Sequence, residues 1–376
     1  MSPSSSKPII FSFFSGSGFL DLGFEQTGFD VRFVNEFHPP FMEAYKYSRK
    51  MMHLPEPKYG YFPGSIEDYV VGDGAKLLID LVEDAKKKSL VGFIGGPPCP
   101  DFSVAGKNKG SEGDNGKLSR VYIDAIIQNK PDFFLFENVK GLWRTVKHRA
   151  FYDQMKTKLE KSGYILTDRL TNAIEYGVPQ DRDRILLFGI HKSHTGKINS
   201  AMLEKNFAWN THIIFDKDIV LNKKFWPTQD TYSTDSKKKC PAIIKPYEEL
   251  TVEYWFKKND VCSHPNAHHH FVPRQALLKF QTILEGDDSK KSFKRLHRWR
   301  YSPTAAYGNN EVHLHPYKDR RLSAAEALAI QSLPKEFSLP ATMTLSNMFK
   351  TIGNGVPYLA AEGLARTIYS FLKSLK

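Results

Sequence analysis

One cysteine of this chain lies in a loop that is too rigid for an ordinary core residue. Cys99 stands between prolines in the stretch GGPPCPDFS, directly after an apolar run, and the chain has three cysteines in all. Flanking prolines restrict the backbone angles and hold the thiol in one orientation. An inert buried cysteine needs no such support, whereas a nucleophilic thiolate does. Cys99 is therefore a candidate catalytic residue.

Two further segments carry charged side chains next to apolar runs. Glu137 ends the run DFFLFE and is followed by Asn138, which could fix the turn, and Arg182 and Arg184 stand two apart in QDRDRILLFGI. Alternate residues of an extended segment share one face, so the two guanidinium groups would point the same way. Beside a thiol they would lower its pKa and hold a carbonyl oxygen. Taken singly, Glu137 could equally cap a turn, and the arginines could form a solvated edge.

A glycine loop near the start of the chain is suited to ligand binding. FFSGSGFLDLGF follows one apolar run and opens a helical pattern, and Glu36 lies eighteen residues after Gly18. Gly16 and Gly18 allow a tight turn and close approach of a ligand. A carboxylate at this distance, after the next strand, is placed to accept hydrogen bonds from ribose hydroxyls. The pattern favours a nucleoside-bearing cofactor, and its spacing differs from that of dinucleotide loops.

Short apolar runs alternate with amphipathic segments from Pro8 to about Ile190, which predicts an α/β fold with a parallel sheet. In such folds ligands bind outside the carboxyl ends of the strands, where the first, third and fourth runs lead into polar or glycine-rich residues. The five predicted strands are IIFSFF, VRFVNE, LVGFIGG, DFFLFEN and RILLFGI, and a helical pattern covers Lys117 to Asn129.

The regular pattern stops after Ile190 and returns near the end of the chain. Residues 191–318 are rich in Lys, His and aromatic residues, with irregular strand-like pieces such as THIIF and DIVL. In RRLSAAEALAIQSLP, Ser323 and Glu326 form a capping-box pattern that predicts a helix start. A second amphipathic helix is predicted from Val356 onward. We therefore expect domains at 1–190 and 191–318, and a segment at 319–376 that returns to the first.

Composition limits the class of protein. The 376 residues are 41% hydrophobic and 25% charged, with a formal net charge of +12. These fractions are typical of a globular protein, and clustered Lys and Arg favour a polyanionic partner. Three scattered cysteines exclude a disulfide framework. The start resembles no signal peptide and no run reaches the length of a membrane span, so we expect a cytoplasmic protein without a membrane partner.

Six motifs, in order along most of the chain, resemble those of the DNA (cytosine-5)-methyltransferases of the bacterial restriction-modification type. They are the cofactor motif FSGSG, the nucleophile motif GGPPCPDFS, the acid motif ENVKGL, the Gln-x-Arg-x-Arg motif QDRDR, the hinge motif RRLSAAEALAIQSLP and the last cofactor motif GNGVP. The resemblance implies a Rossmann-like S-adenosylmethionine-dependent methyltransferase domain with a mostly parallel sheet, plus a smaller irregular target recognition domain.

The resemblance also implies the residues that hold S-adenosylmethionine. They are Phe14, Ser15, Gly16, Gly18, Phe19, Glu36, Phe37, Ser65, Ile66, Pro98, Asn354 and Val356. Two positions depart from the family pattern. Ser65 stands where an Asp commonly binds the adenine amine, so that contact is open between Asp68 and the backbone of Ile66. Pro100 and Asp101 replace the frequent Gln and Gly after the nucleophile.

The implied reaction is methylation of carbon 5 of a cytosine that has been flipped out of duplex DNA. Cys99 would add to carbon 6, Glu137 would protonate ring nitrogen 3 and Arg184 would hold oxygen 2, with Arg182 supporting the loop and thiolate. The expected DNA contacts are Ser103, Lys107, Lys109, Arg298, Arg300 and Thr304. The basic stretch KKSFKRLHRWR, with Phe293 and Trp299 interleaved, favours nucleic acid.

We expect a monomer that produces S-adenosylhomocysteine, associates with the nucleoid when it is bound to DNA, and acts on the same site as a possible cognate restriction endonuclease. Two alternatives use the same motifs: a tRNA cytosine-5 methyltransferase, and a non-catalytic DNA-binding module of this fold. The stretch CSHPNAHHHF contains Cys262, His264, His268 and His270 but lacks the paired spacing of a structural zinc site, so no metal is expected.

Overall fold

A computed structural model describes residues 6–98, 114–196, 198–272, 277–290, 292–305, 307 and 312–375 of the chain. Within these residues the main sheet has the strand order β3-β2-β1-β4-β5-β7-β6. Its strands are β1 (Ile9–Phe13), β2 (Asp30–Glu36), β3 (Gly60–Pro63), β4 (Val91–Gly95), β5 (Phe133–Val139), β6 (Tyr164–Asn172) and β7 (Asp183–His191). The strands from β3 to β5 are parallel, and β7 is antiparallel to both of its neighbours.

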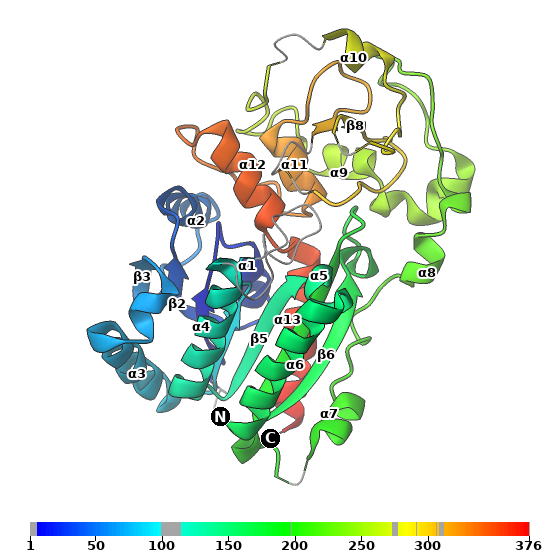
Figure 1. Cartoon of the computed structure of the whole chain (residues 1–376). Helices are drawn as coiled ribbons and strands as arrows, with labels where there is room; N and C mark the ends of the chain where they lie inside the picture. The colour runs from blue at the N-terminus through cyan, green and yellow to red at the C-terminus, as the bar shows by residue number, and fades with distance from the viewer. Residues whose placement is uncertain are drawn as a thin grey trace, which may run out of the picture.

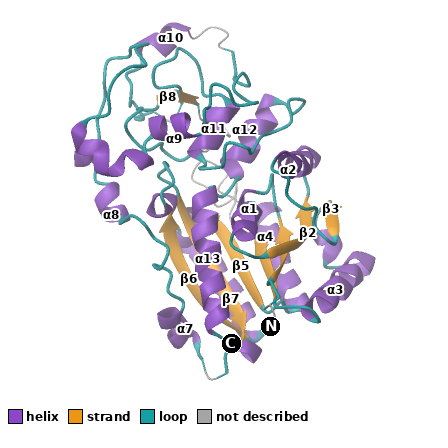
Figure 2. Ribbon diagram, turned by 180° about the vertical axis from the view of Figure 1, so that it is seen from behind, coloured by secondary structure: helices purple, strands orange, loops and turns teal. Residues whose placement is uncertain are grey.

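Helices cover both faces of this sheet, which explains why the strand sequences are continuously apolar rather than alternating. On one face lie α3 (Gly72–Lys86), α4 (Asp114–Asn129), α5 (Lys140–Arg144) and α6 (Val146–Lys161). On the other lie α1 (Phe19–Gln26), α2 (Pro39–Met51), α7 (Ser200–Asn206) and α13 (Tyr358–Ser374). Figures 1 and 2, drawn from opposite sides, show α4 and α6 in front of the sheet in one view and α13 in front of it in the other.

The predicted mostly parallel α/β sheet is confirmed, and all five predicted strands are present. Two strands, β3 and β6, were not predicted. The sequence GYFP of β3 is short, and YILTDRLTN of β6 is polar in its second half. β6 lies at one edge of the sheet and β3 at the other, where burial is less complete and an apolar run is not required.

Residues 191–318, here called the recognition region after the role expected from the sequence, have little regular structure. They contain the helices α7, α8 (Lys217–Val220), α9 (Val252–Lys258) and α10 (Leu277–Thr282) and the strands β8 (Lys294–Arg295) and β9 (His313–Leu314), together with the 3-10 turns η4 (Lys192–His194), η5 (Lys223–Phe225) and η6 (Ala242–Leu250). The strand-like prediction for DIVL is wrong, because Asp216 accepts a hydrogen bond from Asp218 N and starts α8. THIIF, residues 211–215, forms turns and irregular chain instead of a strand.

The end of the chain returns to the sheet. The capping box of Ser323 and Glu326 is confirmed and begins α11 (Ala324–Ile330), which is followed by α12 (Leu345–Asn354) and α13. Gly23 lets α1 approach α13, since a Cβ on Gly23 would lie 2.6 Å from the Cβ of Ala361. The two ends of the chain thus share one hydrophobic cluster on a face of the sheet.

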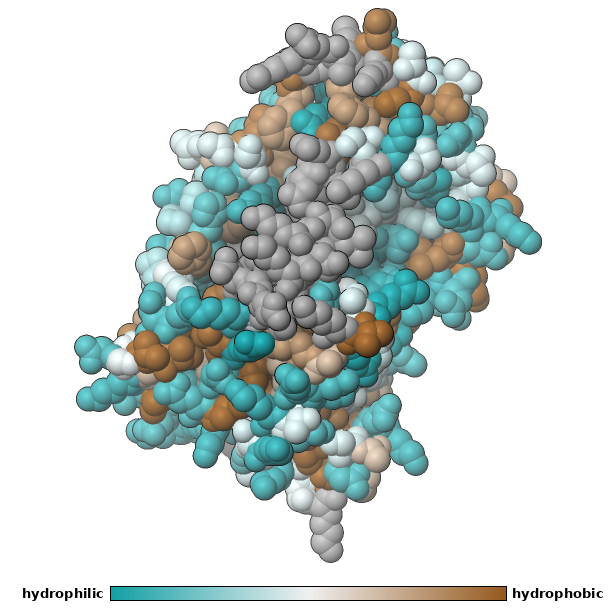
Figure 3. Space-filling view, viewed as in Figure 1, coloured by the Kyte–Doolittle hydropathy of each residue, from teal (hydrophilic) through white to brown (hydrophobic). Residues whose placement is uncertain are grey.

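Of the helices that the structure describes, none combines the length and apolar character that crossing a lipid bilayer requires. The face of the molecule in Figure 3 is mostly hydrophilic, and its hydrophobic residues form small separate patches.

Candidate active site

The reversed direction of β7 brings two predicted catalytic side chains together. Glu137 lies near the carboxyl end of β5, and Arg184 lies near the start of β7, opposite Val139 in the register. Because β7 is antiparallel, its beginning meets the ends of the parallel strands. Arg184 Nε lies 2.7 Å from Glu137 Oε1, and the two side chains are 17% and 9% exposed. The result is an acid and a guanidinium paired at the ligand-binding edge of the sheet.

The base of the predicted nucleophile loop lies against this pair. A Cβ on Gly96 would lie 2.6 Å from Glu137 Oε2, so a larger residue here would displace the Glu137 carboxylate. Asn138 is fully buried and its Nδ2 donates to the carbonyl of Pro97 at 3.5 Å. The acid segment therefore contacts the residues that lead into the loop. Cys99 itself, together with Ser103, Lys107 and Lys109, lies outside the described residues, and the predictions for them stay predictions.

Arg182, the other arginine of the motif, contacts the end of α12. Its side chain is fully buried, and one terminal nitrogen donates to the carbonyl of Gly353 at 3.0 Å. Its backbone N–H donates to Asn172 Oδ1 at 3.2 Å. Arg182 thus links the segment before β7 to Gly353, which lies in α12 and is the first residue of the last cofactor motif. The sequence placed Arg182 and Arg184 in one motif, and the structure gives their side chains different partners.

The glycine loop after β1 has the backbone strain of a ligand-binding turn. Phe14, Gly16 and Gly18 have φ values of 54°, 57° and 87°. A positive φ is costly for a large residue such as Phe14 and is concentrated at functional sites. A Cβ on Gly18 would lie 2.7 Å from the ring of Tyr45. This loop therefore tolerates no side chain at Gly18.

Glu36 closes the loop from the end of β2. Its Oε2 accepts from Gly16 N and its Oε1 from His38 N, both at 2.8 Å. Burial raises the pKa of Glu36, although the two backbone N–H groups oppose that rise. Each carboxylate oxygen has a second lone pair, so the group can still accept a hydroxyl. The arrangement fits the predicted ribose contact.

Other predicted cofactor residues lie around this loop. Within the described part of the chain, buried Ser15 Oγ has no hydrogen-bond partner. Next to Glu36, the ring of Phe37 is 71% exposed and offers a flat apolar face. Phe19, at the start of α1, packs against Gly355, where a Cβ would lie 2.2 Å from its ring. An orphaned hydroxyl, an exposed aromatic ring and a buried carboxylate together suit a nucleoside with a polar tail.

Phe19 also brings the last cofactor motif to the loop, since Asn354 and Val356 flank Gly355. Asn354 is exposed and Val356 is partly buried against the cluster under α13. Ser17 Oγ lies 2.7 Å from Thr351 Oγ1, a second link between the loop and α12.

Ser65 has a structural role that the sequence did not indicate. It caps the 3-10 helix η1 (Ile66–Tyr69), where its hydroxyl accepts from Glu67 N at 3.2 Å. Asp68 Oδ2 in turn accepts from Ser65 N at 3.1 Å. Asp68 and the backbone of Ile66 remain the two candidates for an adenine contact, and Pro98 lies partly buried at the end of the described segment.

A buried polar cluster under the glycine loop was missed from the sequence. Asp21 accepts hydrogen bonds from Ser12 Oγ at 2.7 Å and from Tyr45 OH at 2.8 Å. Arg49 binds both oxygens of Glu25 at 2.7 Å and contacts Tyr45 OH at 3.3 Å. Burial raises the pKa of Asp21 to about 6. The signal was an Asp within the apolar stretch FLDLGF.

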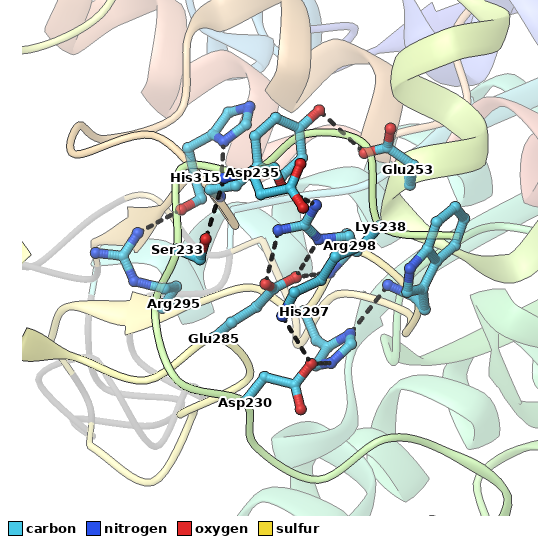
Figure 4. A network of polar contacts seen from close by, with 12 residues as sticks. Asp230, Ser233, Asp235, Lys238, Glu253, Glu285, Arg295, His297, Arg298 and His315 are labelled. Carbon is cyan, nitrogen blue, oxygen red and sulfur yellow. Dashed lines mark hydrogen bonds and ion pairs between the residues drawn. The ribbon is translucent and has the colours of Figure 1, made fainter. Parts of the chain in front are cut away.

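The recognition region corrects one predicted DNA contact and weakens another. Arg298 is fully buried and pairs with Glu285 through Nε at 2.8 Å and its second terminal nitrogen at 2.9 Å (Figure 4). A guanidinium enclosed in this way cannot reach a phosphate, so the predicted DNA contact of Arg298 is wrong. Arg300 is 14% exposed and binds Asp288 at 2.9 Å, a carboxylate with which a phosphate would compete. Trp299 is also buried.

Thr304 lies beside the segment that leads into β7. Its Oγ1 donates to the carbonyl of Asp181 at 2.6 Å, one residue before Arg182. In the His-rich stretch, His264 is buried, with its Nε2 3.0 Å from the carbonyl of Phe337, whereas Cys262 and His268 are exposed. Across the residues with described positions, no group of three metal-ligating side chains occurs.

Comparison with known proteins agrees with the six motifs. A model of the family C-5 cytosine-specific DNA methylase matches residues 9–370. Type II methyltransferase M.NmeDI of Neisseria meningitidis serogroup C is 61% identical over 98% of this chain and 85% of its own length. Type II methyltransferase M.FnuDI of Fusobacterium nucleatum is 29% identical over 96% of this chain and 94% of its own.

Two crystal structures share the fold. One is an E. coli prophage protein assigned as a DNA modification methyltransferase, with a TM-score of 0.64 and 19% identity over 98% of this chain and 100% of that one. The other is the S. pombe Dnmt2 methyltransferase, with a TM-score of 0.58 and 11% identity over 98% and 100%. The family model covers nearly the entire sequence, and the resemblance read from the motifs is confirmed: this chain belongs to the C-5 cytosine-specific DNA methylases.

Proposed function

We propose that this DNA (cytosine-5)-methyltransferase acts as a monomer on a short duplex site, and that it methylates a flipped cytosine through a transient covalent bond from Cys99. The observation that carries the proposal is the pair of Glu137 and Arg184 at 2.7 Å, with Glu137 against Gly96 at the base of the Cys99 loop. In this proposal Cys99 would act as the nucleophile next to the acid and the guanidinium.

The pair matches the edge of cytosine. As a carboxylic acid, Glu137 would donate to ring nitrogen 3 and accept from the exocyclic amine, while Arg184 would donate to oxygen 2. Thymine carries an N–H at position 3, which would face the donor of Glu137, and a carbonyl at position 4, which would face its acceptor oxygen. Neither hydrogen bond could form. The same two side chains would therefore activate cytosine and exclude thymine.

Covalent help is needed because carbon 5 of cytosine is a weak nucleophile. The Cys99 thiolate would add to carbon 6, and the electron pair of the 5,6 double bond would move to carbon 5 as Glu137 protonates nitrogen 3. S-adenosylmethionine, when bound, supplies the methyl group for carbon 5. Methyl transfer would leave S-adenosylhomocysteine, and the nitrogen 3 proton would return to Glu137. Loss of the carbon 5 proton to a solvent-derived base would then re-form the 5,6 double bond and expel Cys99 as thiolate. A positioned acid such as Glu137 contributes about 10²- to 10⁴-fold in rate.

The cofactor would lie over the glycine loop. Glu36 would accept from the ribose hydroxyls, Phe37 would cover the adenine ring, and Ser15 would bind the polar tail. Gly16 and Gly18 would admit the ligand close to the backbone, with Phe14 and Phe19 on either side. The remaining contacts proposed are Ser65, Ile66, Pro98, Asn354 and Val356.

Relatives named type II methyltransferases support a role in a restriction-modification system, with a cognate endonuclease that cuts the same site. The recognition region would then read the duplex, with Thr304 beside the active site. Ser103, Lys107 and Lys109 would contact the backbone near the flipped base. Bisulfite sequencing of DNA from a host that expresses this chain reports the modified base and its sequence context.

Trapping with a fluorinated base tests the covalent step. A duplex with 5-fluorocytosine at the target should form an adduct that survives denaturing electrophoresis, because fluorine cannot leave as a proton. Cys99→Ala should abolish both the adduct and methyl transfer while cofactor binding persists. Full turnover by Cys99→Ala in a tritiated-methyl assay would refute the covalent step. Transfer to tRNA in preference to duplex DNA would refute the proposed substrate.

A further inference from the structure

Two buried glutamines join segments that lie far apart in the sequence. Gln180 is two residues before Arg182, and Gln331 directly follows α11. Both side chains are 0% exposed. Gln180 Nε2 donates to Gln331 Oε1 at 3.2 Å. This contact connects the start of the catalytic strand β7 to the hinge segment across 151 positions of the chain.

Both outer ends of the glutamine pair bind the backbone. Gln180 Oε1 accepts from the backbone N–H of Ala305 at 2.9 Å, and Gln331 Nε2 donates to the carbonyl of Ile352. A backbone N–H can only donate and a carbonyl can only accept, so both amide orientations are fixed without ambiguity. The four groups, from Ala305 to Ile352, form a directional chain of hydrogen bonds here called the amide relay.

The first end of the relay lies in the recognition region beside further links to the catalytic strand. Ser302 N donates to the carbonyl of Pro179 at 2.8 Å, and Asp181 N donates to the carbonyl of Ser302 at 2.9 Å. Thr304 Oγ1 donates to the carbonyl of Asp181. Residues 302–305 thus run beside residues 179–181, and the relay is their buried side-chain connection.

The second end lies next to the cofactor motif. Ile352 precedes Gly353, whose carbonyl accepts from Arg182, and Asn354 follows. The backbone N–H of Tyr358, at the start of α13, donates to the carbonyl of Gln331 at 2.9 Å. Gln331 in the hinge motif therefore connects residues 302–305, the segment before β7 and the last cofactor motif, and holds the three in fixed positions relative to one another.

We propose that Gln180 and Gln331 are positioning residues that set the register of the recognition segment against the catalytic strand. The relay thereby fixes how a bound DNA site is aligned with Arg184 and the acid. Neither glutamine touches substrate in this proposal. It rests on the proposed roles of Arg184 at the base and of residues 302–305 beside the DNA.

The physical basis is the cost of an unmade buried hydrogen bond. In Gln180→Met the N–H of Ala305 and the Oε1 of Gln331 lose their partner, and the recognition segment can shift. Such a loss corresponds to about a tenfold effect on a rate or an equilibrium. Cofactor binding should change less, because Ser17 and Arg182 still hold α12.

The experiment measures kcat and KM for duplex DNA, the preference for the cognate site over a site altered by one base pair, and the Kd for S-adenosylmethionine. Gln180→Met and Gln331→Met should each lower kcat/KM and the site preference about tenfold, with the cofactor Kd within about twofold of wild type. The double variant should lose little more kcat/KM than either single variant, because each single substitution already interrupts the same chain of hydrogen bonds. Gln154→Met, at an exposed position of α6, is the matched control.

Gln180→Glu separates positioning from a general packing defect. The protonated carboxyl of the substituted side chain can accept from Ala305 N and donate to Gln331 Oε1. The ionised carboxylate has no proton to donate, so one of its oxygens faces Gln331 Oε1 and the two acceptors repel each other. Activity relative to wild type at each pH should therefore recover as the pH falls. Gln154→Glu should show no such recovery. This readout also applies if Gln180→Met does not fold.

Three results would overturn the proposal. The first is wild-type kcat/KM and site preference in folded Gln180→Met, and the second is a loss of cofactor affinity equal to the loss in kcat/KM. The third is an activity of Gln180→Glu, relative to wild type, that does not change with pH. Failure of 5-fluorocytosine trapping in the wild-type enzyme would refute the covalent mechanism instead. It would leave the site-preference measurement intact, since that measurement needs only methyl transfer.

Discussion

In residues 6–190 the buried interior consists mainly of aromatic and aliphatic side chains from strands and helices, whereas residues 191–318 combine smaller apolar clusters with buried charged side chains. The rings of Phe11 and Phe33 stack with centroids 5.3 Å apart in the middle of the sheet. In the recognition region, Arg298 and Glu285 form an ion pair in which both side chains are fully buried. The first kind of interior produces a repeating sequence pattern and the second does not.

Arg295 shows how this second kind of interior works. Its guanidinium donates to the carbonyl of Phe280 in α10 and to the carbonyls of Ile283 and His315 in irregular segments, and it lies 4.0 Å from the ring centroid of Tyr232. Backbone groups that would pair in a sheet are here paired by a side chain. Irregular chain can therefore be buried, at the cost of depending on a few charged residues.

The largest expected effect concerns the active site of the sheet region. Glu137→Gln should lower kcat by about 10²- to 10⁴-fold, because the amide cannot supply the proton for ring nitrogen 3. Single-turnover methyl transfer on duplex DNA measures this. The cofactor Kd serves as the control, since Glu137 lies outside the glycine loop. A kcat within twofold of wild type would contradict the role of Glu137.

Removing one partner of the buried ion pair tests the comparison directly. Glu285→Met leaves the Arg298 charge buried without its partner and should destabilise the protein by about 3–5 kcal/mol. Denaturant unfolding measures the loss, and limited proteolysis should place the first cuts in the recognition region.

The matched control is the double variant Glu285→Met with Arg298→Met. An apolar pair of similar volume should recover most of the stability, because no charge remains buried. If the double variant were as unstable as Glu285→Met, the charge would not be the cause and the comparison would fail.

Asp21 is a buried acid in the sheet region and gives that region a pH dependence. Its pKa is raised to about 6 in the folded protein, against 3.8 for the free side chain. The unfolded chain then ionises first, so the contribution of Asp21 to stability is complete below the unfolded pKa and is lost as the pH rises through about 6. Between pH 4 and pH 8 the loss should be about 2 kcal/mol.

Asp21→Asn removes this titration while keeping the size of the side chain. The free energy of unfolding of the wild type, minus that of Asp21→Asn, should decrease over this pH range. Urea titrations at several pH values measure the difference. A difference that stays constant or increases would contradict the raised pKa.

The smallest effect is expected at the hinge between the two regions. Ser323→Ala removes the cap that accepts from Glu326 N and should cost about 1 kcal/mol, as caps usually do. Ser323→Asp should retain most of the stability, since Asp also caps helices. Thermal unfolding distinguishes the two variants, and equal melting temperatures would show that the cap contributes nothing here.

The sequence was informative where a structural rule repeats along the chain. Continuous apolar runs predicted the five strands that are buried on both faces, and Ser323 with Glu326 predicted the start of α11. It failed at the edge strands β3 and β6, where burial is partial, and at DIVL, where the cap at Asp216 decides the outcome. The DNA contact predicted for Arg298 failed because a basic residue in a charged stretch carries no sign of its burial.

The sequence by itself determined the sheet region, its order of motifs and the family to which the chain belongs, since these depend on residue types at fixed spacing. The tertiary structure decided that β7 runs against its neighbours, and only this reversal places Arg184 beside Glu137. It also decided that Gln180 meets Gln331 and that Asp21 accepts hydrogen bonds from Ser12 and Tyr45. Contacts between distant segments depend on how strands and helices pack in three dimensions, and no local pattern in the sequence encodes them.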